Sequence, residues 1–294
     1  MLKDFLQVDA FSSRPLFGNP AAVVFDGDDI PTPLMQKIAQ EMNLSETVFI
    51  CTPTVPDADY RARIFTPRSE LPFAGHPTIA AAHAVLARDL GKGRGLLRQE
   101  CGIGIIPVEV LAHPAGRLLR MTQGAPKARD PGLPRATVAR MLSCAEADLA
   151  DAPIEVVSTG ASWLVVELAS QAALSALAPD LGLIQRECAA IGAPGVTAFA
   201  EKRDGSPVRL RLRTFAPGEG VAEDPVCGSG NGSVCAFLAR HRHAGDAAGS
   251  YIAEQGIEIG RDGEIHASWR RDGEALRIMI AGDAATVASG QLHL

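Results

Sequence analysis

The alternation of apolar and polar positions predicts strands in both halves of the chain. Residues 21–25 (AAVVF) and 165–168 (VVEL) are short apolar runs of the length that strands have. Arg209, Arg211 and Arg213 alternate with leucines, and a period of two places the three arginines on one face of a strand. We interpret that face as structural and not as an anion site.

Two segments of small apolar residues predict helices. Residues 77–87 (PTIAAAHAVLA) follow Gly75, and residues 232–240 (GSVCAFLAR) follow Gly228, at an offset of 228 − 75 = 153. The first segment has almost no polar face, so we expect a buried helix with a sheet wrapped around it. Each half of the chain is therefore predicted to consist of strands around one apolar helix.

These similarities belong to an internal repeat. Residues 61–67 (RARIFTP) return as residues 211–217 (RLRTFAP), an offset of 150. A period this long indicates duplicated domains and not a solenoid. When the two copies are aligned at this offset, Glu46 corresponds to Val196. The second copy therefore keeps the surrounding pattern and lacks the carboxylate. One carboxylate in a duplicated frame suggests one proton-transferring base that serves one site between the halves.

The chain of 294 residues is long enough for two medium-sized domains. Residues 123–134 contain three prolines and two glycines, which indicates a linker. We therefore predict an N-terminal half at residues 1–126 and a C-terminal half at residues 127–283. We expect the last strand, residues 284–294, to join the N-terminal half, and the active site to lie in the cleft between the halves.

The charge and the cysteines exclude several classes of protein. A net charge of −6 provides no basic surface for nucleic acid and argues against binding to an anionic membrane. No hydrophobic run reaches the length of a membrane span. The six cysteines are scattered without a Cys-x-x-Cys pair, which is typical of reduced thiols and not of a disulfide frame or a zinc site. We therefore expect a cytoplasmic protein with no nucleic acid, membrane or metal partner.

Three segments carry the residues that could do chemistry. They are residues 45–47 (SET), 71–78 (LPFAGHPT) and 223–232 (EDPVCGSGNG). The last two lead into the predicted helices, and helix N-termini bind carboxylates and oxyanions through unpaired backbone N–H groups. Two such termini facing each other would suit a small anionic substrate, with Glu46, His76 and Asp224 as candidate acid–base groups around it.

Four motifs in this order resemble the PhzF-like proteins of phenazine biosynthesis. They are residues 18–24 (GNPAAVV), 44–47 (LSET), 75–78 (GHPT) and 223–229 (EDPVCGS). The resemblance extends over residues 8–280 and implies an α+β fold of the diaminopimelate epimerase-like type. Such a fold has two pseudo-symmetric halves, each a curled, mostly antiparallel sheet around a central helix. The named member of the family isomerises a dihydro-hydroxyanthranilate by moving a proton between carbons, without a cofactor.

The resemblance also implies roles for individual residues. Glu46 would remove a proton from a carbon acid and return it, while His76 and Asp224 would polarise or orient the substrate. The residues that would bind the carboxylate-bearing substrate are Asn19, Gly75, Gly228 and Ser229. A glutamate acts best as such a base when burial raises its pKa toward neutrality, so we expect a buried Glu46. The resemblance implies no cofactor and no metal, and homodimers are common in the family.

Two departures from the family pattern leave alternatives open. Cys227 stands where these isomerases more often have threonine, and Asn231 stands where histidine is common. Racemases and epimerases of this fold use a catalytic cysteine at the place of Cys227 and a second cysteine in the other half, where this chain has Ala74. An amino-acid racemase or epimerase that uses Cys227 is one alternative, and a non-catalytic small-anion-binding protein is another. The identity of the substrate does not follow from the fold.

Overall fold

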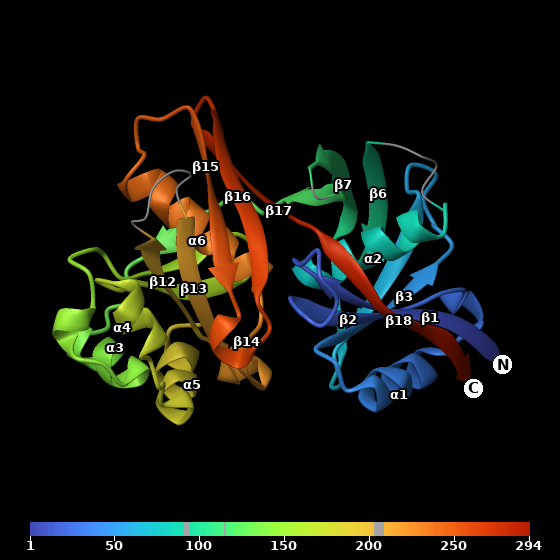
Figure 1. Ribbon diagram of the computed structural model, residues 1–294, viewed down its shortest axis with the longest axis horizontal. Helices are drawn as coiled ribbons and strands as arrows, with labels where there is room; N and C mark the ends of the chain where they lie inside the picture. Colours follow the sequence, from blue (N-terminus) through green and yellow to red (C-terminus); the bar gives the residue numbers. More distant parts are fainter. Residues whose placement is uncertain (91–94, 115, 203–208) are drawn as a thin grey trace. The chain divides into compact units, whose positions relative to one another are not determined.

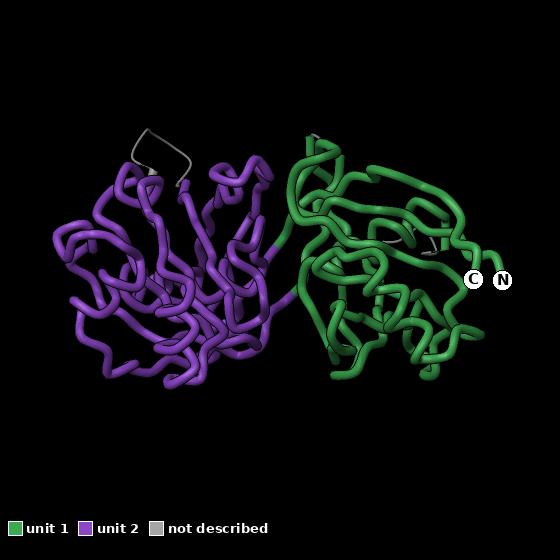
Figure 2. Tube along the Cα trace, turned by 90° about the horizontal axis from the view of Figure 1, so that it is seen from below, with its two compact units in different colours: residues 1–121, 281–294 green, residues 122–280 purple. Residues whose placement is uncertain are grey.

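The computed structural model describes residues 1–90, 95–114, 116–202 and 209–294. The chain forms two compact units, residues 1–121 with 281–294 and residues 122–280 (Figure 2). The observed boundaries between the units lie a few residues before the expected ones at 126 and 283. The first unit therefore contains both ends of the chain.

The first unit combines a sheet with helices on both of its faces (Figure 1). Its elements are β1 (Leu2–Ala10), β2 (Asn19–Val24), η1 (Gly27–Asp29), α1 (Thr32–Met42), β3 (Glu46–Cys51), β4 (Tyr60–Phe65), β5 (Glu70–Leu71), α2 (Gly75–Ala87), β6 (Leu96–Cys101), β7 (Gly104–His113), β8 (Gly116–Thr122) and β18 (Ala284–His293). The C-terminal strand β18 pairs antiparallel with β1 along its whole length, which explains why the last residues belong to this unit.

The second unit also combines a sheet with helices on both of its faces, and it has additional outer helices (Figure 1). Its elements are β9 (Lys127–Arg129), α3 (Arg135–Leu142), η2 (Glu146–Asp148), β10 (Glu155–Ser158), β11 (Ser162–Glu167), α4 (Gln171–Ser175), α5 (Leu181–Ala190), β12 (Val196–Lys202), β13 (Arg209–Ala216), η3 (Pro217–Glu219), β14 (Val221–Asp224), α6 (Gly228–His241), β15 (Ala248–Gln255), η4 (Ile257–Ile259), β16 (Gly263–Asp272) and β17 (Ala275–Gly282). The expected linker, residues 123–134, contains β9, which pairs with β10.

Both units have the same order of strand pairings. In the first unit β2 pairs antiparallel with β1 and parallel with β3, and β4 pairs antiparallel with β3 and parallel with β6. In the second unit β11 pairs in the same way with β10 and β12, and β13 with β12 and β15. The repeat in the sequence is therefore a duplication of structure. Glu46 and Val196 are the first residues of the equivalent strands β3 and β12.

Each unit encloses one central helix. Helix α2 packs against β1, β2, β3, β4, β6 and β18, and helix α6 packs against β10, β11, β12 and β16. A sheet can reach one helix with so many strands only if it curls around the helix. Small side chains such as Ala80, Ala81 and Ala82, all fully buried, allow this close approach. Both predicted helices are thus observed at the predicted places, and the first is buried as expected.

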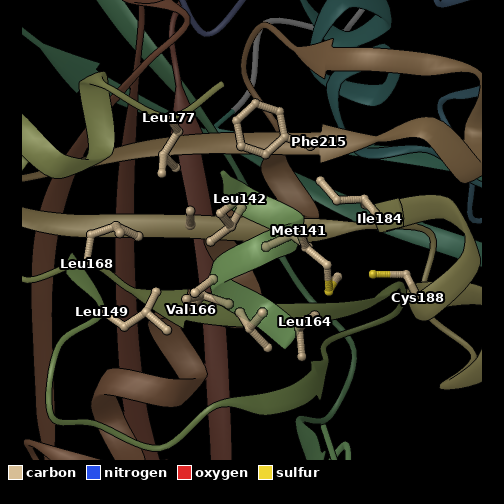
Figure 3. Close-up of a cluster of buried hydrophobic side chains, with 14 of the residues drawn as sticks. Met141, Leu142, Leu149, Leu164, Val166, Leu168, Leu177, Ile184, Cys188 and Phe215 are labelled. Carbon is tan, nitrogen blue, oxygen red and sulfur yellow. The ribbon is translucent and has the colours of Figure 1, made fainter. Parts of the chain in front are cut away.

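Outer helices cover the opposite side of each sheet. In the second unit Met141 and Leu142 of α3 and Ile184 of α5 pack on Leu164 and Val166 of β11, as Figure 3 shows. The first unit has a smaller cluster in which α1 covers β3 and β4. Burial of these apolar side chains supplies the main stabilisation of each unit, at about 25 cal/mol per Å² removed from water.

The three alternating arginines occupy one strand and bind carboxylates of the protein itself. Their partners are Glu254 and Glu264 for Arg209, Glu258 for Arg211 and Glu223 for Arg213. The arginines therefore form the structural strand face that the sequence predicts.

Three further features concern membranes, metals and thiols. Across residues 1–90, 95–114, 116–202 and 209–294, no helix combines the length and apolarity that a membrane span requires. The same residues contain no group of three His, Cys, Asp or Glu side chains arranged to hold a metal ion. All six cysteines are free thiols.

Candidate active site

Glu46 and His76 meet in the first unit. Glu46 is the first residue of β3, where it pairs with Ala21 of β2, and His76 is the second residue of α2. The Oε2 atom of Glu46 lies 2.9 Å from Nε2 of His76, and the side chains are 14% and 10% exposed. The contact has the distance of an ion pair without the angle of a hydrogen bond. A carboxylate and an imidazole this close and this shielded are a chemically competent acid–base pair.

The local sequence determines which backbone groups α2 exposes next to this pair. Ala74, the residue before the helix, is extended and has no side chain that could cap the first turn. Pro77, the third helical residue, has no N–H group. Gly75 and His76 are therefore the donors of the first turn, and they lie at the positive end of the helix dipole. This arrangement favours an anion beside the carboxylate of Glu46.

The start of α6 in the second unit offers the same two donors by different means. Cys227 precedes the helix, and its Sγ atom accepts a hydrogen bond from the N–H of Gly230 at 3.3 Å. The third N–H group of the helix is thus occupied by sulfur, whereas in α2 it is absent because of Pro77. Gly228 and Ser229 remain as the first-turn donors.

Asp224 is held by a network of buried amides. It ends β14, its Oδ1 atom accepts from the N–H of Val226 at 3.1 Å, and its carbonyl accepts from Nε2 of Gln255 at 2.9 Å. The Oε1 atom of Gln255 in turn accepts from the N–H of Cys227 and from Nδ2 of Asn231. Asn231 therefore fixes the loop between Asp224 and the helix.

The environment of Cys227 keeps its thiol protonated. Burial raises the pKa of the Cys227 thiol well above its usual 9.0, and the negative charge of Asp224 raises it further. Ala74 occupies the equivalent place before α2 and carries no thiol. Cys227 is therefore a poor base at neutral pH, and no second cysteine stands at the matching position.

Asn19 lies on the strand beside Glu46. It is the first residue of β2, pairs with Ala10 of β1 and is 1% exposed. Because side chains alternate along a strand, Asn19 shares a face of β2 with Ala21, the residue that pairs with Glu46.

The predicted residues fall into two groups, one in each unit. The first group contains Asn19, Glu46, Gly75 and His76, and the second contains Asp224, Cys227, Gly228 and Ser229. The cleft between the halves stays a prediction. The sequence analysis missed Gln255. The repeat did offer a signal, since the equivalent residue of the first copy is Cys101 and the two copies differ at this position. The sequence analysis also missed Trp163, whose indole N–H donates to Oγ of Ser229 at 3.0 Å.

Comparisons with known proteins identify relatives of the whole chain. The family of phenazine biosynthesis-like proteins matches residues 8–290. The trans-2,3-dihydro-3-hydroxyanthranilate isomerase of Pseudomonas aeruginosa is 38% identical over 291 residues, which cover 99% of each chain. The crystal structure of a PhzF-family phenazine biosynthesis protein from Bacillus anthracis superposes with a TM-score of 0.93 at 28% identity, over 100% of both chains. A probable proline racemase from Agrobacterium radiobacter K84, with a TM-score of 0.66 at 15% identity over 99% of this chain and 93% of its own, shares the fold.

Proposed function

The chain belongs to the family of phenazine biosynthesis-like (PhzF) proteins, and we propose that Glu46 is the acid–base residue of its isomerase activity. Relatives that are 36–38% identical along the whole chain are trans-2,3-dihydro-3-hydroxyanthranilate isomerases. The proposed substrate is accordingly a small carboxylated ring compound of the dihydroanthranilate class. The observation that carries the proposal is the contact between Glu46 and His76 at 2.9 Å, at the start of a helix that favours anions.

The proposed reaction moves one proton within one molecule. Glu46 accepts a proton from a ring carbon, so a C–H bond breaks, a carboxyl O–H bond forms, and the electron pair shifts into the conjugated system. The same carboxyl group then gives the proton to another carbon, which restores the carboxylate. Substrate and product are isomers, no electron is gained or lost, and the step consumes no cofactor. General acid–base transfer of this kind contributes about 10²- to 10⁴-fold to the rate.

The side chains around Glu46 and at the start of α6 support this role. His76 contacts Oε2 of Glu46 and leaves Oε1 for the proton of the substrate. Gly75, Gly228 and Ser229 would bind the substrate carboxylate through first-turn N–H groups and a hydroxyl, and Asp224 would orient a polar substituent. Donors that are fixed in advance lower the barrier because they need no reorganisation while charge develops.

The test is solvent deuterium exchange, followed by NMR. Trans-2,3-dihydro-3-hydroxyanthranilate in D₂O is incubated with the wild type, Glu46→Gln, Cys227→Ser and Glu41→Gln, the last being an exposed glutamate on α1. We expect Glu46→Gln to lose exchange and turnover by about 10²- to 10⁴-fold. The other two variants should keep both.

Three results would contradict the proposal in different ways. Exchange that survives in Glu46→Gln would remove Glu46 as the base. Loss of exchange in Cys227→Ser, with inversion at an α-carbon of an amino acid, would identify a racemase. Saturable binding of the substrate without any exchange in the wild type would identify a non-catalytic binding protein.

A further inference from the structure

In each unit, a side chain of the surrounding sheet contacts the second residue of the central helix. In the first unit this residue is His76, and Glu46 of β3 contacts it. In the second unit it is Ser229, and Trp163 of β11 donates a hydrogen bond to its Oγ atom at 3.0 Å. Ser229 is partly exposed between two buried glycines, whereas Trp163 is only 4% exposed. The sheet of each unit therefore provides one side chain that controls the polar group at the helix start.

The donor and acceptor roles at Ser229 follow from chemistry. An indole N–H can only donate, so the oxygen of Ser229 must accept, and its own hydrogen points elsewhere. Its other side-chain partner is Sγ of Cys227 at 3.5 Å, and either atom of that hydrogen bond could be the donor. The sulfur already accepts from the N–H of Gly230, and sulfur is a weak acceptor. A carboxylate oxygen is a stronger acceptor, so an incoming anion can take the hydroxyl hydrogen of Ser229 in place of the sulfur.

We propose that Trp163 is a positioning residue that sets Ser229 as a hydrogen-bond donor to the carboxylate of the substrate. This inference rests on the proposed function, in which Gly228 and Ser229 bind that carboxylate. With Trp163 in place, the hydroxyl and the two first-turn N–H groups all present hydrogen atoms to the same anion. Without the indole N–H, the hydroxyl is free to rotate and to accept, and one fixed donor is lost.

The chain contains a matched control for this tryptophan. Trp269 is the only other tryptophan, it lies on β16 and it is also 4% exposed. Among the described residues its Nε1 atom has no hydrogen-bond partner. Replacement of Trp269 by phenylalanine therefore removes a similar buried ring, which packs on the imidazole of His243, without breaking a hydrogen bond, and this separates packing from positioning.

The first test compares steady-state kinetics with trans-2,3-dihydro-3-hydroxyanthranilate. We expect Trp163→Phe to raise KM about five- to tenfold, the effect of losing one hydrogen bond, with kcat changed less than about twofold. Trp269→Phe should leave KM unchanged. The double variant Trp163→Phe/Ser229→Ala should match Ser229→Ala alone, because Trp163 acts through Ser229. Additive losses in the double variant, or equal effects of the two tryptophan variants, would overturn the inference.

A second test keeps Trp163 and depends on neither turnover nor the folding of a Trp163 variant. In the Trp269→Phe background Trp163 is the only tryptophan, so its fluorescence reports on Ser229. Benzoate serves as a carboxylate probe, because it does not absorb at the wavelengths that excite indole selectively. We expect a saturable change in emission that disappears when Ser229→Ala is added. The same change without Ser229 would overturn the inference.

The proposed function and this inference can fail separately. Glu46→Gln should keep the benzoate response, because Glu46 lies in the other unit and acts on the proton and not on the carboxylate. A lost response in that variant would contradict the division of roles between Glu46 and Ser229. A kept response without deuterium exchange in the wild type would contradict the proposed reaction and support the role of Trp163.

Discussion

The starts of the two central helices have the same first-turn N–H donors, but different side chains of the sheet contact them. In α2 the third N–H group is missing because of Pro77, and in α6 the sulfur of Cys227 occupies it, so each helix keeps two donors for an anion. The difference lies in what the sheet adds. The first unit adds a carboxylate, Glu46, and the second adds an N–H donor, Trp163. Under the proposed function, the duplicated frame thus adds a proton-transferring group in one copy and a further group for anion binding in the other, without a change of backbone.

The hairpins that lead into these helices show a second contrast. Arg63 and Glu70 form a bidentate pair in the first unit, and Arg213 and Glu223 form the equivalent pair in the second. The first pair is 19% and 39% exposed, whereas the second is 8% and 10% exposed. Arg213 also donates to the carbonyl group of Leu174, near the end of α4, and to that of Leu177, just after this helix. The same ion pair is therefore a surface feature in one copy and a buried one in the other.

Glu46→Val tests the first contrast most strongly, since it makes the first copy match the second at this position. We expect kcat to fall by about 10²- to 10⁴-fold, because the acid–base group is gone. The fold should persist, because Val196 occupies the same place in β12 without difficulty. Turnover of trans-2,3-dihydro-3-hydroxyanthranilate and a thermal unfolding curve check both statements. A variant that keeps a tenth of the wild-type kcat would contradict the assignment.

Paired substitutions in the two hairpins sharpen the second contrast. Glu223→Gln leaves the buried guanidinium of Arg213 without its carboxylate, so we expect a loss of about 3–5 kcal/mol in the free energy of unfolding. Glu70→Gln breaks the exposed pair with Arg63 and should cost about 0–1 kcal/mol. Urea unfolding of both variants measures the difference. Equal losses would show that burial does not distinguish the two pairs.

Glycines in the first turns provide a smaller test. A Cβ atom on Gly230 would lie 2.7 Å from Oγ1 of Thr197 and 3.1 Å from Oγ1 of Thr214, two buried side chains on adjacent strands. We expect Gly230→Ala to cost about 1–3 kcal/mol through overpacking. In α2 a Cβ atom on Gly75 would meet only the flexible end of Met121 at 3.2 Å, so Gly75→Ala should cost less than about 1 kcal/mol. Unfolding midpoints in urea compare the two variants, and an equal shift would contradict this difference.

The smallest effect concerns the one histidine in the middle of a central helix. Burial lowers the pKa of His83 from 6.5 to about 4, with a further contribution from the positive charge of Arg117. The unfolded chain therefore binds a proton at this site before the folded chain does, and stability that is present above pH 6.5 is lost as the pH falls toward 4. The slope reaches at most about 1.4 kcal/mol per pH unit.

The equivalent residue of α6, at the same offset of 153, is the buried Ala236, so only the first copy carries this dependence. His83→Gln should flatten the curve of unfolding free energy against pH between 6.5 and 4. His293→Gln, which replaces an exposed histidine at the end of the chain, should leave the curve as it is. Identical curves for wild type and His83→Gln would contradict the prediction.

Much of the architecture was accessible from the sequence because it depends on local patterns. The small apolar segments after Gly75 and Gly228 predicted one apolar helix in each half, and both helices are observed with most of their residues buried. The alternation of arginines and leucines predicted the strand that is observed as β13. The four motifs correctly identified the family and an isomerase, and the predicted α+β fold of two similar halves is confirmed. The division of labour at the site stays a prediction.

The polar contacts of the site were not accessible in the same way. Trp163 and Ser229 are 66 positions apart, and Gln255 lies 31 positions from Asp224. Whether two such residues meet depends on the register of several strands between them, and a shift by one residue would turn each side chain to the other face of its sheet. A buried tryptophan in an apolar strand carries no mark in the sequence that tells whether its N–H has a partner. Trp163 and Trp269 are equally buried and differ in this respect.

The sequence by itself determined the duplicated frame, the two central helices and the asymmetry of Glu46 against Val196, because repeats and periodicities can be recognised along the chain without knowing which segments pack together. The tertiary structure decided which side chains share a hydrogen bond and which are shielded from water. It turned equivalent arginine–glutamate pairs into one exposed and one buried pair. The physical reason is that strand register and the packing of outer helices set distance and burial, and these depend on segments far apart in the chain.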